Sequence, residues 1–162
     1  MEKSATHSKK TYSLVAMSLC VAILVVCSWI TVPFTIPFSL QTLAVPLIVM
    51  LIGGKRGLIV TLCYILLGAV GLPVFSGFQG GIYVLLGPTG GYILGFILWA
   101  VSFIIFEKIT ANKQLKTISY ILINVFCLVI VYVFGTLWFV FGWQEADSGM
   151  NIATAITICV LP

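Results

Sequence analysis

Long runs of apolar residues, separated by short polar or Gly/Pro-rich segments, dominate the pattern of this chain. A helix needs about 20 consecutive apolar residues to span a bilayer. The runs predict helices over Thr11–Thr31, Ser39–Gly53, Gly57–Gly71, Gly90–Phe106 and Thr117–Gly142, and a sixth that begins near Met150. We therefore predict an all-α membrane protein with six transmembrane helices, forming a single domain over residues 1–162.

The second and third runs are short for straight, lipid-exposed crossings. Irregular backbone at membrane depth is tolerated only where protein or a water-filled cavity satisfies its polar groups. Because the segments beside these runs are rich in Gly and Pro, we expect them to complete the crossings. They would form a Gly/Pro-rich outer loop over a cavity that opens outward.

Composition supports a membrane location. Hydrophobic residues make up 61% of the 162 positions and charged residues only 7%, whereas soluble domains carry about 25% charged residues. A signal peptide is a poorer interpretation of the first run, Leu14–Ile30. It is longer than the usual apolar core of about 7–15 residues, and no small-residue cleavage site follows it.

The basic residues predict the orientation. They fall in the N-terminal tail, in the Lys55-Arg56 pair and in the loop after the fourth run, and the alternate loops contain no Lys or Arg. Because cytoplasmic loops are enriched in Lys and Arg, we expect a multi-pass protein of the cell membrane with a cytoplasmic N-terminus. No basic stripe with interleaved aromatic residues is present, so nucleic acid is excluded as a partner.

Catalytic and metal-binding patterns are missing from the sequence. The lone His7 lies in the polar tail, the five cysteines form no C-x-x-C pair, and no carboxylate lies inside a predicted span. The Gly53-Gly54-Lys55-Arg56 turn lacks the spacing of a phosphate-binding loop. These observations argue against an enzyme, a metal site, a cofactor and an autonomous ion-driven pump.

The segment Gly71–Tyr92 is the strongest candidate for a binding site. Its glycines allow close backbone approach, and a small-molecule site is mostly apolar with a few placed polar groups. The expected ligand-binding residues here are Phe75, Ser76, Gly77, Phe78, Gly80, Gly81, Tyr83, Thr89 and Tyr92. The alternative is a re-entrant loop that only packs between helices.

Two further features are candidates for binding roles. Gln41 and Thr42 lie near the outer boundary at the start of the second run, either as ligand contacts or as an interfacial helix cap. In the first run, small residues recur four positions apart, which lets another membrane helix approach closely. The expected partner-docking residues are Ala16, Ser18, Cys20 and Ala22, with packing inside the protein as the alternative.

These strings resemble a known family. Gly71-Leu72-Pro73-Val74-Phe75-Ser76-Gly77-Phe78, then Gly80-Gly81 and Gly87–Tyr92, together with Ile36–Leu43, are similar to the BioY family of biotin-binding S components of energy-coupling factor (ECF) transporters. The resemblance implies six membrane helices and an outward-facing biotin pocket. It also implies three partner subunits, a transmembrane coupling protein and two ATP-binding proteins, with the first helix docking on the coupling protein.

The chain departs from the family pattern near its end. The resemblance implies a Pro-Gly-Asp-x-x-Lys segment whose Asp and Lys contact biotin, and residues up to Pro162 do not include it. We expect the sixth helix to be truncated in this sequence, and residues 1–162 alone to bind biotin weakly or not at all. An S component for another vitamin and a structural membrane protein without a ligand remain alternative hypotheses.

Overall fold

The computed structural model describes residues 2–32, 38–110 and 117–143. The described part is helical apart from one short strand pair and the connections. In chain order the elements are α1 (Glu2–Trp29), β1 (Thr31–Val32), β2 (Phe38–Ser39), α2 (Gln41–Ile52), α3 (Gly54–Ala69), the 3-10 turn η1 (Ser76–Phe78), α4 (Ile82–Leu86), α5 (Gly90–Thr110) and α6 (Thr117–Trp143).

The long helices fall on the predicted apolar runs. Within the described residues, three stretches are long and apolar enough to cross a membrane: Lys10–Trp29, Gly90–Ile109 and Ser119–Gly142. Helices α2 and α3 are shorter, with 12 and 16 residues, as their runs predicted. The all-helical fold is thus confirmed, whereas the predicted sixth helix from Met150 lies outside the described residues.

Two details differ from the predicted pattern. Helix α1 begins at Glu2 rather than near Thr11, because Lys, Glu and Ala favour helix without contributing to an apolar run. The Pro-rich break after α1 also contains a strand pair, in which Thr31 faces Ser39 in antiparallel register. The amide of Leu40 donates to the carbonyl of Ile30 at 2.9 Å and so closes this reversal at the start of α2.

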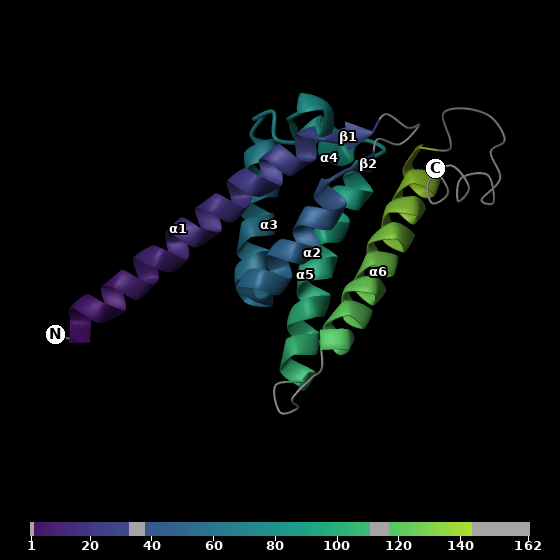
Figure 1. Ribbon diagram of the computed structural model, residues 1–162. Coiled ribbons are helices and arrows are strands. Elements are labelled where there is room, and N and C mark those ends of the chain that lie inside the picture. Colours follow the sequence, from purple (N-terminus) through teal and green to yellow (C-terminus); the bar gives the residue numbers. More distant parts are fainter. Residues whose placement is uncertain (1, 33–37, 111–116, 144–162) are drawn as a thin grey trace.

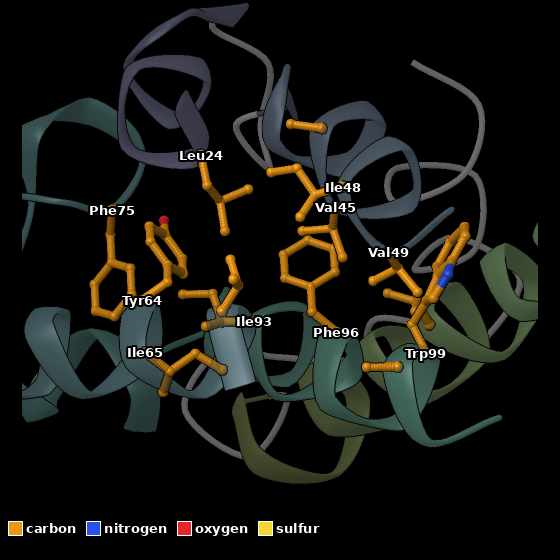
Figure 2. Packing of buried hydrophobic residues seen from close by; sticks show 14 of the residues in the cluster. Leu24, Val45, Ile48, Val49, Tyr64, Ile65, Phe75, Ile93, Phe96 and Trp99 are labelled. Atoms are coloured by element: carbon orange, nitrogen blue, oxygen red, sulfur yellow. The ribbon is translucent and has the colours of Figure 1, made fainter. Parts of the chain in front are cut away.

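A single apolar core joins α1, α2, α3 and α5 (Figure 2). Leu24 of α1 and Val45 of α2 are almost fully buried in it. Tyr64 of α3 and Phe96 and Trp99 of α5 supply the large rings. This core holds the helix ends in fixed relative positions, which in turn positions the connections between them.

Helices α5 and α6 interlock through two glycines near one end. The Trp138 side chain of α6 lies over Gly91 of α5, and the Tyr92 ring of α5 lies over Gly135 of α6. A Cβ atom at either glycine would overlap the ring of the partner helix. The close approach therefore requires glycine at both positions.

The connections divide between the two ends of the bundle (Figure 1). The strand pair, η1, α4 and the first residues of α5 gather at one end, with the C-terminal ends of α1 and α6 beside them. The α2–α3 turn lies toward the other end, as does the C-terminal part of α5. The Gly/Pro segment and the start of α2 thus share one end, as the sequence predicted.

Candidate functional site

The connection from α3 to α5 folds as a compact unit rather than an open loop. The amide of Phe75 donates to the carbonyl of Gln79 at 2.9 Å and closes a tight turn around η1. Gly77 within the turn has φ of 69°, and Gly81 before α4 has φ of 106°. Both values lie in the left-handed region that glycine adopts without steric cost, so the local sequence dictates this fold.

Three side chains anchor this connection to α1 and α3. Ser28 and Tyr64 both donate their hydroxyls to the carbonyl of Val74, at 2.5 and 2.9 Å. The indole N–H of Trp29 donates to the carbonyl of Pro73 at 2.8 Å. Backbone carbonyls that lack partners in a helix or sheet are satisfied in this way. The connection is therefore fixed to the core at its first turn.

Phe75 lies beneath the connection, inside the core. Its side chain is fully buried and meets the Tyr64 ring edge-on, with centroids 5.6 Å apart. The ring occupies the space that a side chain at Gly68 would need. The carbonyl of Gly68 in turn accepts a hydrogen bond from the amide of Gly81 at 2.7 Å. The role of Phe75 visible in this structure is to seat the connection on α3.

The aromatic residues that face outward are Phe78 and Tyr83. Their side chains are 62% and 66% exposed. Phe78 has φ of 59°, a conformation that non-glycine residues rarely adopt. Its ring stacks on Trp29 with centroids 4.9 Å apart. Beside it, the buried hydroxyl oxygen of Ser76 has no hydrogen-bond partner among the described residues.

At the start of α2, Gln41 and Thr42 have different environments. Gln41 is only 3% exposed, and its Oε1 accepts a hydrogen bond from the Ser39 hydroxyl at 3.3 Å. Its amide nitrogen Nε2 is buried and meets no partner among the described residues. Thr42 donates its hydroxyl to the carbonyl of Ser39 at 3.0 Å. The alternative of a helix cap is not what the structure shows, since no side chain accepts a free amide at the start of α2.

The remaining candidates lie where α5 begins. The carbonyl of Thr89 accepts the amides of Tyr92 and Ile93 at the first turn of α5. The Tyr92 hydroxyl lies 3.3 Å from that of Thr136 in α6. Trp138 of α6 donates its indole N–H to the carbonyl of Gly87 at 3.2 Å. The end of α6 is thereby tied to the same connection.

These contacts define a site without charge. Among the described side chains, the charged groups are Lys10 at the start of α1 and Lys55, Arg56, Glu107 and Lys108 near the other end of the bundle. The described residues of the connection therefore offer a ligand hydrogen-bonding groups and aromatic surfaces. Sites of this kind fit a small, largely apolar molecule with a few polar atoms.

The small residues of α1 fall on two faces. Ala16 and Cys20 are both half-buried. The side chain of Cys20 packs against the apolar core. Ser18 and Ala22 line an apolar groove of about 880 Å³ between α1 and α3. The four predicted docking residues therefore do not form one surface, and only Ser18 and Ala22 line this groove.

Sequence reasoning missed Ser28, Trp29, Tyr64 and Trp138 as parts of the site. Each lies within or at the end of an apolar run, where a polar atom is indistinguishable from an ordinary interfacial residue. One usable signal is that Ser28 and Trp29 end the first run directly before the Pro-rich break. Their side chains turn toward backbone carbonyls of the Gly/Pro connection.

Comparison with known proteins identifies relatives over most of the chain. The model of the BioY family matches residues 1–162. The chain is 39% identical over 150 residues to the biotin transporter BioY of Thermotoga maritima, covering 92% of this chain and 83% of that protein. It is 38% identical over 152 residues to the biotin transporter BioY2 of Lactococcus lactis, covering 93% and 81%.

A solved structure has the same fold. It is the crystal structure of the S-component for biotin from an ECF-type ABC transporter. The two folds match with a TM-score of 0.78 at 24% sequence identity, over 92% of this chain and 79% of the other.

Proposed function

The chain belongs to the BioY family, and from this membership we propose that it binds biotin for uptake as the S component of an ECF-type transporter. It is a component of membrane transport and not an enzyme. Its apolar helices fit a multi-pass membrane protein. The relatives from Thermotoga maritima and Lactococcus lactis are both named biotin transporters. The solved S-component structure has the same fold as this chain.

The buried amide of Gln41 is the observation that carries the binding proposal. An amide N–H₂ group that is buried without a partner destabilises the protein by roughly 1–3 kcal/mol. A ligand that accepts a hydrogen bond from this group would remove that cost. Biotin offers a ureido carbonyl and a carboxylate, both of which accept hydrogen bonds. Gln41 lies at the end of the bundle that holds the Gly/Pro connection, so we assign its Nε2 to biotin.

Residues at the same end of the bundle fit the rest of the ligand. The exposed rings of Phe78 and Tyr83 offer apolar surfaces for the bicyclic ring and the aliphatic chain. The unpartnered Ser76 hydroxyl is a second hydrogen-bonding group. Thr42, Phe75, Gly77, Gly80, Gly81, Thr89 and Tyr92 complete the proposed binding set as backbone and packing positions.

The family membership supports further proposals about the whole protein. We infer six membrane helices, a cytoplasmic N-terminus in the cell membrane and a biotin pocket that faces outward. The proposed partners are a transmembrane coupling subunit and two ATP-binding subunits. Ser18 and Ala22, which line the groove beside α1, are the better candidates for contact with the coupling subunit. Ala16 and Cys20 do not line it.

Replacing Gln41 by Met tests the binding role directly. The substitution keeps the side-chain length and removes both the unpartnered amide nitrogen and the oxygen that accepts the Ser39 hydroxyl. Because these two effects oppose each other, the free energy of unfolding should change little. In the chain extended by the C-terminal segment of the Thermotoga maritima relative, biotin affinity should fall roughly tenfold, the value of one strong hydrogen bond. A matched control is Asn124→Leu in α6, whose buried Oδ1 is also unpartnered, and which should leave biotin affinity unchanged.

Equilibrium binding of labelled biotin and unfolding in mixed micelles provide the two readouts. A loss of stability with Gln41→Met at unchanged affinity would assign the residue a structural role. That result would contradict its assignment to biotin.

A further inference from the structure

A second concave site lies at the opposite end of the bundle from the Gly/Pro connection. It is a cavity of about 310 Å³ between the α2–α3 turn and the C-terminal part of α5. Since one water occupies about 30 Å³ of liquid volume, this space accommodates a group of several heavy atoms. None of the residues proposed to bind biotin lines it.

Three cationic side chains and one carboxylate line this cavity. The cations are Lys55 and Arg56 of α3 and Lys108 of α5, and the carboxylate is Glu107. None of the four forms an ion pair within the part of the chain that the structure describes. The carboxylate instead accepts a hydrogen bond from the amide of Gly54, at 3.1 Å. The cavity therefore carries a formal excess of two positive charges.

The first amide of α3 is already bonded to Glu107, and three cationic side chains line the cavity beside it. A Cβ atom at Gly54 would meet the Glu107 carboxylate and Ile104 of α5 at 2.9 and 2.8 Å, so these side chains would have to move. This close packing holds the carboxylate against the turn. The Lys55, Arg56 and Lys108 side chains are left available to a ligand.

Apolar residues surround the cationic groups. Ile52 and Ile104 line the cavity itself. The neighbouring side chains of Leu51 and Ile109 are 80% and 75% exposed, and they lie at the ends of helices that the bilayer must cover. A lipid covers them with its acyl chains while its headgroup reaches the cations.

We propose that this cavity binds the headgroup of an anionic phospholipid. Basic pockets between membrane helices are known to hold acidic headgroups, and here the phosphate would lie among Lys55, Arg56 and Lys108. The site fixes a lipid at the α2–α3 turn, on the face that carries the basic loops. The proposal is independent of biotin binding, because it uses a different end of the molecule.

Native mass spectrometry of the full detergent-purified chain tests this assignment. The chain is titrated with dioleoyl phosphatidylglycerol and, separately, with zwitterionic dioleoyl phosphatidylcholine. The test variant is Lys55→Gln/Arg56→Gln/Lys108→Gln. The control variant, Lys3→Gln/Lys9→Gln/Lys10→Gln, removes the same charge from the N-terminal part of α1, which lies apart from the α2–α3 turn (Figure 1).

The wild-type chain should prefer phosphatidylglycerol, and each cation should contribute roughly fivefold to affinity. The test variant, which lacks all three, should therefore lose roughly a hundredfold, and the control variant less than about threefold. Equal binding of the two lipids would overturn the proposal. Equal losses in both variants would overturn it too, since they would indicate diffuse attraction. Displacement of the lipid by an equal molar concentration of glycerol 3-phosphate would overturn it in favour of a site for soluble anions, because it would show that the acyl chains contribute nothing to binding.

A second variant, expected to gain affinity, keeps the test valid if the triple variant fails to fold. Glu107→Gln keeps an acceptor for the Gly54 amide and removes the one negative charge in the cavity. It should tighten phosphatidylglycerol binding roughly fivefold while phosphatidylcholine binding stays constant. Unchanged or weaker phosphatidylglycerol binding by this variant would overturn the proposal, whatever the triple variant does.

Discussion

The anchoring of the Gly/Pro connection depends on one buried backbone carbonyl. Val74 is 7% exposed, and its carbonyl oxygen accepts the hydroxyls of Ser28 and Tyr64. The Ser28 hydroxyl also lies 2.6 Å from the carbonyl of Val25, so its single hydrogen is shared. Among the described residues, the Tyr64 hydroxyl has Val74 as its carbonyl acceptor, whereas that of Ser28 has two. Removing both hydroxyls leaves the carbonyl without either side-chain partner.

The expected energies follow from that arrangement. A single hydrogen bond of this kind contributes about 1 kcal/mol, whereas leaving a buried acceptor unsatisfied costs roughly 1–3 kcal/mol. Tyr64→Phe should cost about 1 kcal/mol, and Ser28→Ala somewhat less, because one of the two donors remains in each single variant. The double variant should lose about 3 kcal/mol. The coupling between the two sites should thus be about 1 kcal/mol, measurable in a double-mutant cycle.

Unfolding of the purified protein in mixed micelles, followed by circular dichroism, measures these free energies. Tyr132→Phe in α6 is a matched control, since the Tyr132 hydroxyl makes no hydrogen bond among the described residues. It should change stability by less than about 0.5 kcal/mol. If the double variant costs no more than the sum of the single variants, the carbonyl does not depend on these two hydroxyls and the reasoning is refuted.

Two glycine contacts give further tests by the same unfolding measurement. Gly68→Ala places a methyl group where the buried Phe75 ring lies. The overpacking should lower the free energy of unfolding by about 2 kcal/mol. An unchanged free energy of unfolding would contradict the observed contact between Phe75 and Gly68. Gly91→Ala meets Trp138 and should separate α5 from α6 with a similar loss. Gly142→Ala is the control for both, because no atom lies within 4 Å of its added Cβ. It should be neutral or slightly stabilising by helix propensity.

Much of the fold follows from the sequence because a bilayer imposes a length on apolar runs. The five runs before Met150 predicted where α1, α2, α3, α5 and α6 lie. The start of α1 was less predictable, since its polar first turns carry no apolar periodicity. The β1–β2 pair depends on the backbone bond from Leu40 to Ile30, which brings together residues on either side of the Pro-rich break.

The candidate site was predictable as a segment but not residue by residue. Glycine and proline identify the connection after α3 in the sequence, but they do not show which residues it contacts in the folded protein. The position of Phe75, however, is set by Gly68 on the preceding helix, and that of Trp29 by a carbonyl of Pro73. Both are tertiary contacts. An aromatic residue in such a segment is equally compatible with lining a ligand and with filling the core.

The most direct test of biotin recognition is equilibrium binding of labelled biotin to the purified chain. It is made with residues 1–162 and with the same chain followed by the C-terminal segment of the Thermotoga maritima relative, because the family resemblance implies an Asp and a Lys contact there. We predict saturable binding by the extended form, displaced by unlabelled biotin and not by riboflavin or thiamine. If neither form shows biotin-displaced binding although both are helical and monodisperse, biotin is not the ligand of this protein.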